Sequence, residues 1–133
     1  MINEKSCGAF VLNGKKVLIV QQKKSGIYGF PKGHVEPNET EEETAIREVK
    51  EETGVDIEII SNKKYSISYM QNENINKEVV YYLTKAMNKK SQEQQEKEIS
   101  NIVWVEIEDV EKILSFENIK ALWLEAKNDL QNK

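Results

Sequence analysis

The chain has 133 residues, a net charge of −4 and 32% charged residues, which suits one folded domain with a modest core. The negative charge argues against a surface that coats nucleic acid, and no apolar run approaches the ~20 residues that a membrane-spanning helix needs. Polar residues at positions 3–5 interrupt any signal-peptide pattern, so we expect a single cytosolic domain over residues 1–133.

The chain contains one cysteine, Cys7, and one histidine, His34. A single cysteine excludes an intrachain disulfide, and its apolar surroundings predict a buried strand position. A lone histidine argues against a His-rich zinc site and against a Ser-His-Asp or Cys-His mechanism.

The chain opens with two apolar runs, residues 6–12 and 16–21. Asn13-Gly14 lies between them, and this pair between β-branched runs predicts a hairpin. Residues 27–33 follow a polar loop, and their Gly and Pro residues predict an extended approach to the next element.

Residues 40–53 read as a helix with clear start and stop signals. Thr40 and Glu43 form a capping box, and Gly54 is placed to end the helix in the left-handed conformation. At roughly 100° per residue, Ala45 and Val49 fall on one face.

The neighbouring face of this helix carries three carboxylates, Glu48, Glu51 and Glu52. Glu48 and Glu52 have the repulsive i, i+4 spacing, which costs ~0.2–0.5 kcal/mol. They also lie towards the C-terminal end, where the helix dipole favours cations by ~0.3–1 kcal/mol. A solvated acidic face is the simple interpretation, but clustered carboxylates also suit a hard divalent cation such as Mg²⁺ or Mn²⁺.

The remaining residues predict more strands and two helices around a mixed sheet covered on both faces. The strand segments are 56–61, 65–70, 77–87 and 102–107, with a turn at 71–76, a polar loop at 88–98, and helices beginning at 108 and covering 117–130.

The stretch from Gly33 to Val55 resembles the Nudix signature. That signature is Gly, five residues, Glu, seven residues, Arg-Glu-aliphatic, one residue, Glu-Glu, one residue, Gly-aliphatic. All nine defined positions match, at Gly33, Glu39, Arg47, Glu48, Val49, Glu51, Glu52, Gly54 and Val55.

The resemblance implies an α/β/α sandwich in which the signature helix covers one face of a mixed sheet and the C-terminal helices cover the other. It also implies hydrolysis of a nucleoside diphosphate linked to another moiety, with Mg²⁺ or Mn²⁺. Glu48, Glu51 and Glu52 would be metal ligands, and the backbone carbonyl of Gly33 would lie near the metal. Metals neutralise the diphosphate and activate a bound water.

Other signature residues would support this site. Arg47 would brace the loop and helix through carboxylate partners, with Glu39 supporting that arrangement and Gly54 ending the helix. Glu98 precedes the strand that contains Trp104, where many Nudix enzymes carry a further metal ligand or general base.

The segment from Tyr28 to Pro37 indicates which groups within the Nudix family the chain resembles. Its Pro-Lys-Gly-His-Val-Glu-Pro run is similar to asymmetric dinucleoside tetraphosphatases and to diphosphoinositol polyphosphate phosphohydrolases. In the tetraphosphatases, Lys32 and Lys77 would contact phosphates, and Tyr69 and Phe116 would sandwich a base. Phe116 replaces a frequent tyrosine, so stacking survives but a hydroxyl contact does not. Core packing is the alternative role for both aromatic residues.

The favoured reaction is cleavage of diadenosine tetraphosphate to ATP and AMP. Clean-up of non-standard nucleoside triphosphates is an alternative that predicts contacts to one base edge. RNA 5′-end pyrophosphohydrolysis fits the net negative charge of the chain less well. A further alternative is a nucleotide sensor that has lost catalysis, although such a protein would usually have lost a signature carboxylate. We expect a small-molecule nucleotide as partner, without membrane or stable nucleic-acid contacts, and either a monomer or a homodimer.

Overall fold

The computed structural model describes residues 1–87 and 99–132 of the chain. Its strands are β1 (Ile2–Asn13), β2 (Lys16–Gln22), β3 (Tyr28–Gly29), β4 (Lys32–His34), β5 (Ile57–Asn72), β6 (Ile75–Ala86) and β7 (Ile99–Glu106). Its helices are α1 (Glu41–Thr53), α2 (Val110–Ile113) and α3 (Glu117–Gln131), with a 3₁₀ turn at Ile107–Asp109 before α2.

The strands form one mixed sheet in which β1 is central. β1 runs parallel to β6 along almost its whole length, and β6 pairs antiparallel with the edge strand β5. On its other side β1 pairs with β4 near its start and with β2 at its end. The predicted hairpin is confirmed, with Gly14 in the left-handed region at φ 61°.

One apolar layer lies between the sheet and α1. Successive strand residues point to opposite faces, so Ala9 and Val11 of β1 face this layer, where they are completely buried. Val49 of α1 packs against them in the same cluster. Cys7 is also buried on this side, as predicted.

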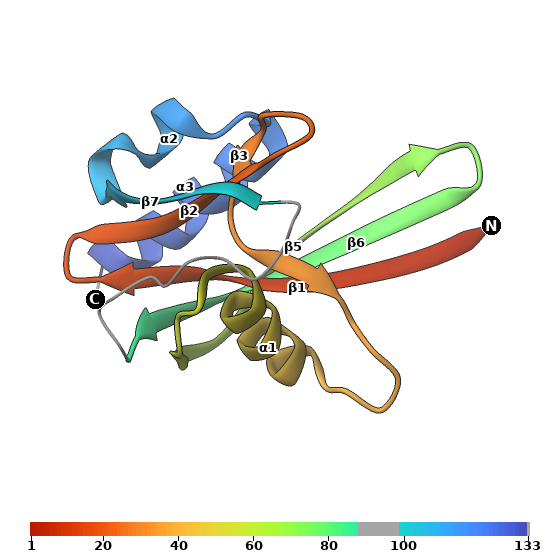
Figure 1. Cartoon of the computed structure of the whole chain (residues 1–133), viewed down its shortest axis with the longest axis horizontal. Helices are drawn as coiled ribbons and strands as arrows, with labels where there is room; N and C mark the ends of the chain where they lie inside the picture. Colours follow the sequence, from red (N-terminus) through yellow and green to blue (C-terminus); the bar gives the residue numbers. More distant parts are fainter. Residues whose placement is uncertain (88–98, 133) are drawn as a thin grey trace.

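The second layer lies between the sheet and α3. The Phe10 ring meets Phe30 edge-on at a centroid distance of 4.6 Å, stacks on Tyr81 at 5.0 Å and lies 5.6 Å from Trp123 of α3. Figure 1 shows α1 and the C-terminal helices on opposite sides of the sheet. The predicted α/β/α sandwich is therefore confirmed.

The ends of α1 agree with the prediction. Thr40 Oγ1 accepts from Glu43 N at 3.0 Å, and Glu43 Oε1 accepts from Thr40 N at 2.8 Å, completing the capping box. Gly54 follows the last turn at φ 76° and donates to Lys50 O.

Several boundaries differ from the prediction: β1 begins at Ile2 and β7 at Ile99, both earlier than expected. Residues 56–61 and 65–70 belong to one strand, β5, which passes the polar stretch 62–64 through a break in register between Ile59 and Lys64. The turn predicted at 71–76 is shorter than expected, because β5 ends at Asn72 and β6 begins at Ile75. The helix predicted from residue 108 is a 3₁₀ turn followed by the short α2. The predicted loop 88–98 lies outside the described residues.

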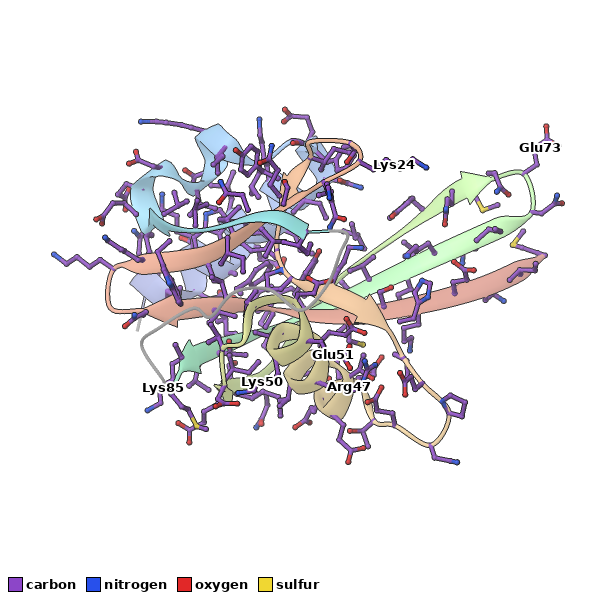
Figure 2. All side chains as sticks on the ribbon, viewed as in Figure 1. Lys24, Arg47, Lys50, Glu51, Glu73 and Lys85 are labelled. Carbon is purple, nitrogen blue, oxygen red and sulfur yellow. The ribbon has the colours of Figure 1, made fainter. Side chains whose placement is uncertain are left out.

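Beyond the helices, β1, β5 and β6 continue as a three-stranded extension that ends beside the N-terminus (Figure 1). Glu73 marks its tip in Figure 2. Within the described residues, every helix is too short or too polar to span a membrane.

Candidate active site

A cavity of about 660 Å³ opens where β4, α1 and the start of α3 meet the sheet. Four elements contribute the residues that the sequence singled out. These lining residues are Lys32 and Gly33 of β4, Glu48 and Glu52 of α1, Tyr69 of β5, Lys77 of β6 and Phe116 just before α3.

Arg47 lies at the centre of a carboxylate cluster beside this cavity. Its Nε and Nη2 donate to the two carboxylate oxygens of Glu39 at 2.7 and 3.0 Å, a paired arrangement that suits the planar guanidinium. Its Nη1 donates to Glu48 Oε2 at 2.8 Å and to Glu51 at 3.2 Å. Its Nη2 also donates to His34 O at 3.0 Å, which ties β4 to α1.

Figure 2 shows Arg47 and Glu51 on the same side of α1, with Lys50 on the other side. One arginine therefore offsets the repulsion between two of the carboxylates on this face, Glu48 and Glu51. A lysine could not reproduce the paired geometry, because its ammonium is a single point of charge.

The protonation of Glu39 reflects this cluster. The Arg47 guanidinium lowers the pKa of Glu39 to about 2, and hydrogen bonds from Thr44 Oγ1 and Glu36 N act in the same direction against the effect of burial. Hydrogen bonds to Glu39, Glu48 and Glu51 in turn raise the pKa of Arg47. Glu39 and Arg47 are consequently both charged at neutral pH and hold the loop before α1 against the helix.

The carboxylate of Glu48 occupies the space where a side chain at position 33 would begin. A Cβ added to Gly33 would collide with the carboxylate of Glu48. Next to this contact, the backbone N–H of Lys32 donates to Glu52 Oε1 at 3.3 Å, and Glu52 is buried. The sequence spacing thus places Glu48 and Glu52 directly against the backbone of β4.

The donor atoms at this place fit a hard divalent cation. Glu48, Glu51 and Glu52 offer carboxylate oxygens, the ligand type that Mg²⁺ prefers. Among the described residues, however, no three His, Cys, Asp or Glu side chains converge as a ready metal cluster. Arg47 engages Glu48 and Glu51, while Glu52 accepts from Lys32 N.

Two lysines, Lys32 and Lys77, add positive charge to the lining of the cavity. Burial lowers the pKa of Lys32, and the nearby charge of Lys77 lowers it further, whereas Glu52 and Glu48 raise it. Lys77 Nζ lies 3.3 Å from His34 Nε2. Two ammonium groups and two carboxylates that line one cavity suit a phosphate chain that bridges metal and lysines.

The two aromatic residues proposed for base stacking lie at the cavity and are accessible. Tyr69 keeps 38% and Phe116 keeps 51% of its surface exposed, so neither is a core residue. Tyr81 and Tyr82, in contrast, are buried in the two layers of the core.

One predicted metal ligand among the described residues is not part of the cavity lining. Glu51 lies beside Arg47 but does not line the cavity, and Glu98 lies outside the described residues. Sequence reasoning missed other lining residues, among them Ser6, Gln22 and Asn118. No local pattern marks them, because only the sheet register and the position of α3 bring them to this place.

A family model for the NUDIX domain matches residues 3–126. The chain belongs to the Nudix hydrolase family. The mouse asymmetrical bis(5′-nucleosyl)-tetraphosphatase is 30% identical over 108 residues, which cover 77% of this Nudix chain and 73% of the mouse protein.

Yeast mRNA-decapping enzyme subunit 2 is 27% identical over 140 residues. The match includes 95% of this Nudix chain, but the chain spans only 14% of the length of that yeast protein. Among solved structures, a Caenorhabditis elegans Ap4A hydrolase binary complex superimposes with a TM-score of 0.84 at 29% identity, covering 98% of this chain and 99% of the other. The Nudix fold therefore extends over nearly the whole chain.

Proposed function

We propose that this Nudix hydrolase cleaves dinucleoside polyphosphates, with diadenosine tetraphosphate as the principal substrate and ATP and AMP as products. One observation carries the proposal: a single cavity is lined by two signature carboxylates, two lysines and two accessible aromatic rings. A long anionic chain with a base at its end matches that set of groups. The likeness to the mouse asymmetrical tetraphosphatase and to the C. elegans Ap4A hydrolase supports the same substrate class.

Glu48, Glu51 and Glu52, with the carbonyl oxygen of Gly33, would hold Mg²⁺, and Mn²⁺ would also suit these donors. The cation supplies charge neutralisation and lowers the pKa of a bound water. Glu98 is proposed as a further ligand or general base, from its place in the sequence alone.

The remaining residues bind and orient the substrate. Lys32 and Lys77 would contact the phosphate chain as point charges. Tyr69 and Phe116 would stack on a base, a contact worth ~1–3 kcal/mol per base. Arg47 is a positioning residue: it orients Glu48 and Glu51 and joins β4 to α1.

The first experiment is product analysis by chromatography after incubation with diadenosine tetraphosphate and Mg²⁺. Equal amounts of ATP and AMP, and their loss when EDTA removes the metal, would support the proposal. Two molecules of ADP would mean that a different phosphorus is attacked. Absence of products would reject the tetraphosphatase assignment.

A second candidate is hydrolysis of nucleoside triphosphates to a monophosphate and diphosphate. Gln22 and Asn118 favour it, because amide side chains at the cavity can read the edge of a single base. A relative from Mycobacterium tuberculosis described as a putative mutator protein is 28% identical over 134 residues. Faster cleavage of triphosphates than of diadenosine tetraphosphate in the same assay would select this candidate.

A further inference from the structure

Ser6 carries a buried hydroxyl that the proposed chemistry leaves unused. The residue is completely buried, its Oγ forms no hydrogen bond with any described residue, and it lines the cavity. Leaving a buried hydroxyl without a partner costs about 1–3 kcal/mol. Such a group therefore indicates a ligand or ordered water that accepts its proton.

The sheet register places Ser6 on the floor of the cavity. Ser6 lies opposite His34 on β4 and opposite Val79 on β6. Residues opposite each other in neighbouring strands point to the same face, about 5 Å apart. These three side chains thus form one row across the face that bears α3.

The two phosphate-binding lysines flank this row. Lys32 is two residues before His34 on β4, and Lys77 is two residues before Val79 on β6, so both point to the same face as Ser6. β4 and β6 lie on opposite sides of β1 and run in opposite directions. Lys32 therefore approaches the row from the His34 end, and Lys77 approaches it from the Val79 end. Lys77 Nζ lies 3.3 Å from His34 Nε2, although the two residues belong to strands on opposite sides of β1.

We propose that Ser6 Oγ donates a hydrogen bond to a non-bridging phosphate oxygen held between Lys32 and Lys77. This inference rests on the proposed function, since it assumes that the cavity takes a phosphate chain. The positive charges of Lys32 and Lys77 repel each other, and an anion held between them would offset that repulsion. The hydroxyl below them supplies a directional donor that fixes which oxygen of that anion faces the sheet.

The proposal requires that the side chains above Ser6 move apart when the anion enters. The His34–Lys77 contact is the one that must open, because Lys77 Nζ would exchange the imidazole nitrogen for a phosphate oxygen. A charged acceptor makes a stronger hydrogen bond than a neutral one, which favours the exchange.

The test is Ser6→Ala, with calorimetric titration of inorganic tripolyphosphate in the presence of Mg²⁺. We expect the dissociation constant to rise about tenfold, the change expected for a lost hydrogen bond to a charged group. Ser66→Ala, an exposed serine on the opposite face of β5, is the matched control and should bind like the wild type. Urea unfolding of Ser6→Ala should be unchanged or shifted to higher urea, because the variant removes an unpaired buried hydroxyl.

Unchanged tripolyphosphate binding in Ser6→Ala would overturn the proposal and assign the hydroxyl to an ordered water. Loss of affinity accompanied by a shift to lower urea would overturn it as well, since the serine would then be structural. The readout does not depend on turnover. Weaker tripolyphosphate binding by Ser6→Ala supports the hydrogen bond from Ser6 even if the protein does not cleave diadenosine tetraphosphate. If Ser6→Ala binds tripolyphosphate with unchanged affinity and still cleaves diadenosine tetraphosphate, the proposed function holds but the hydrogen bond from Ser6 does not.

Discussion

The pairing of Glu39 with Arg47 leads to a prediction about stability and pH. Glu39→Gln keeps the side-chain volume and the hydrogen bond to Thr44, but removes the charge that Arg47 contacts twice. The pKa of Glu39 falls from an ordinary 4.5 to about 2. A pKa change of one unit corresponds to about 1.36 kcal/mol, so this change limits the stabilisation of the fold by Glu39 to roughly 3 kcal/mol. The side chain keeps 14% exposure and the glutamine retains part of the bonding, so we expect a loss of about 1–2 kcal/mol at pH 7.

The direction of the pH dependence follows from the sign of the pKa change. The folded-state pKa of Glu39 lies below the unfolded value, so its stabilisation is complete above about pH 4.5 and is lost as the pH falls towards 2. The stability difference between the wild type and Glu39→Gln should therefore be full at pH 7, clearly smaller at pH 3, and lost only as the pH approaches about 2.

The assay is urea unfolding at pH 7, 5, 4 and 3, followed by tryptophan fluorescence. Glu42→Gln, on the exposed side of the same helix, is the control and should stay within about 0.5 kcal/mol of the wild type. The electrostatic explanation is refuted if the wild type and Glu39→Gln have the same free energy of unfolding at pH 7. It is also refuted if the two proteins differ in that free energy as much at pH 3 as at pH 7.

Three further predictions concern the cavity. Glu52→Gln should lower kcat by more than about 100-fold with unchanged circular dichroism, since it removes a proposed metal ligand; normal turnover would disprove that role. Gly33→Ala should displace the Glu48 carboxylate and weaken Mg²⁺ binding about 10- to 100-fold in a calorimetric titration, and wild-type affinity would show that this contact is irrelevant to the metal. Phe116→Ala or Tyr69→Ala should raise the KM for diadenosine tetraphosphate roughly 5- to 100-fold, with Phe116→Tyr as the conservative control, and an unaltered KM would argue against stacking.

The elements that the sequence predicted well are those determined by local interactions. The limits of α1 depend on Thr40, Glu43 and Gly54, each of which bonds within a few residues of itself. The spacing of Glu48, Glu51 and Glu52 on that helix is equally local, because it follows from the helical period. The fold class followed from these patterns and from the resemblance to the Nudix signature.

The course of β5 could not be read from the sequence. The polar residues 62–64 suggested a break between two strands, yet β5 runs through them. Within the part of the chain that the structure describes, β5 lies at the edge of the sheet and pairs only with β6, so one side of the strand can carry polar residues through a register shift.

The sequence by itself determined the carboxylate face, its arginine and the helix that carries them, because these depend on short-range geometry. Only the tertiary structure decided which distant side chains share the cavity. Tyr69 and Lys77 meet because β5 and β6 pair in that register, and Ser6 joins them because β1 runs parallel to β6. The hydroxyl of Ser6 has no distinguishing sequence pattern, and its burial without a hydrogen-bond partner among the described residues appears only once the strands are assembled.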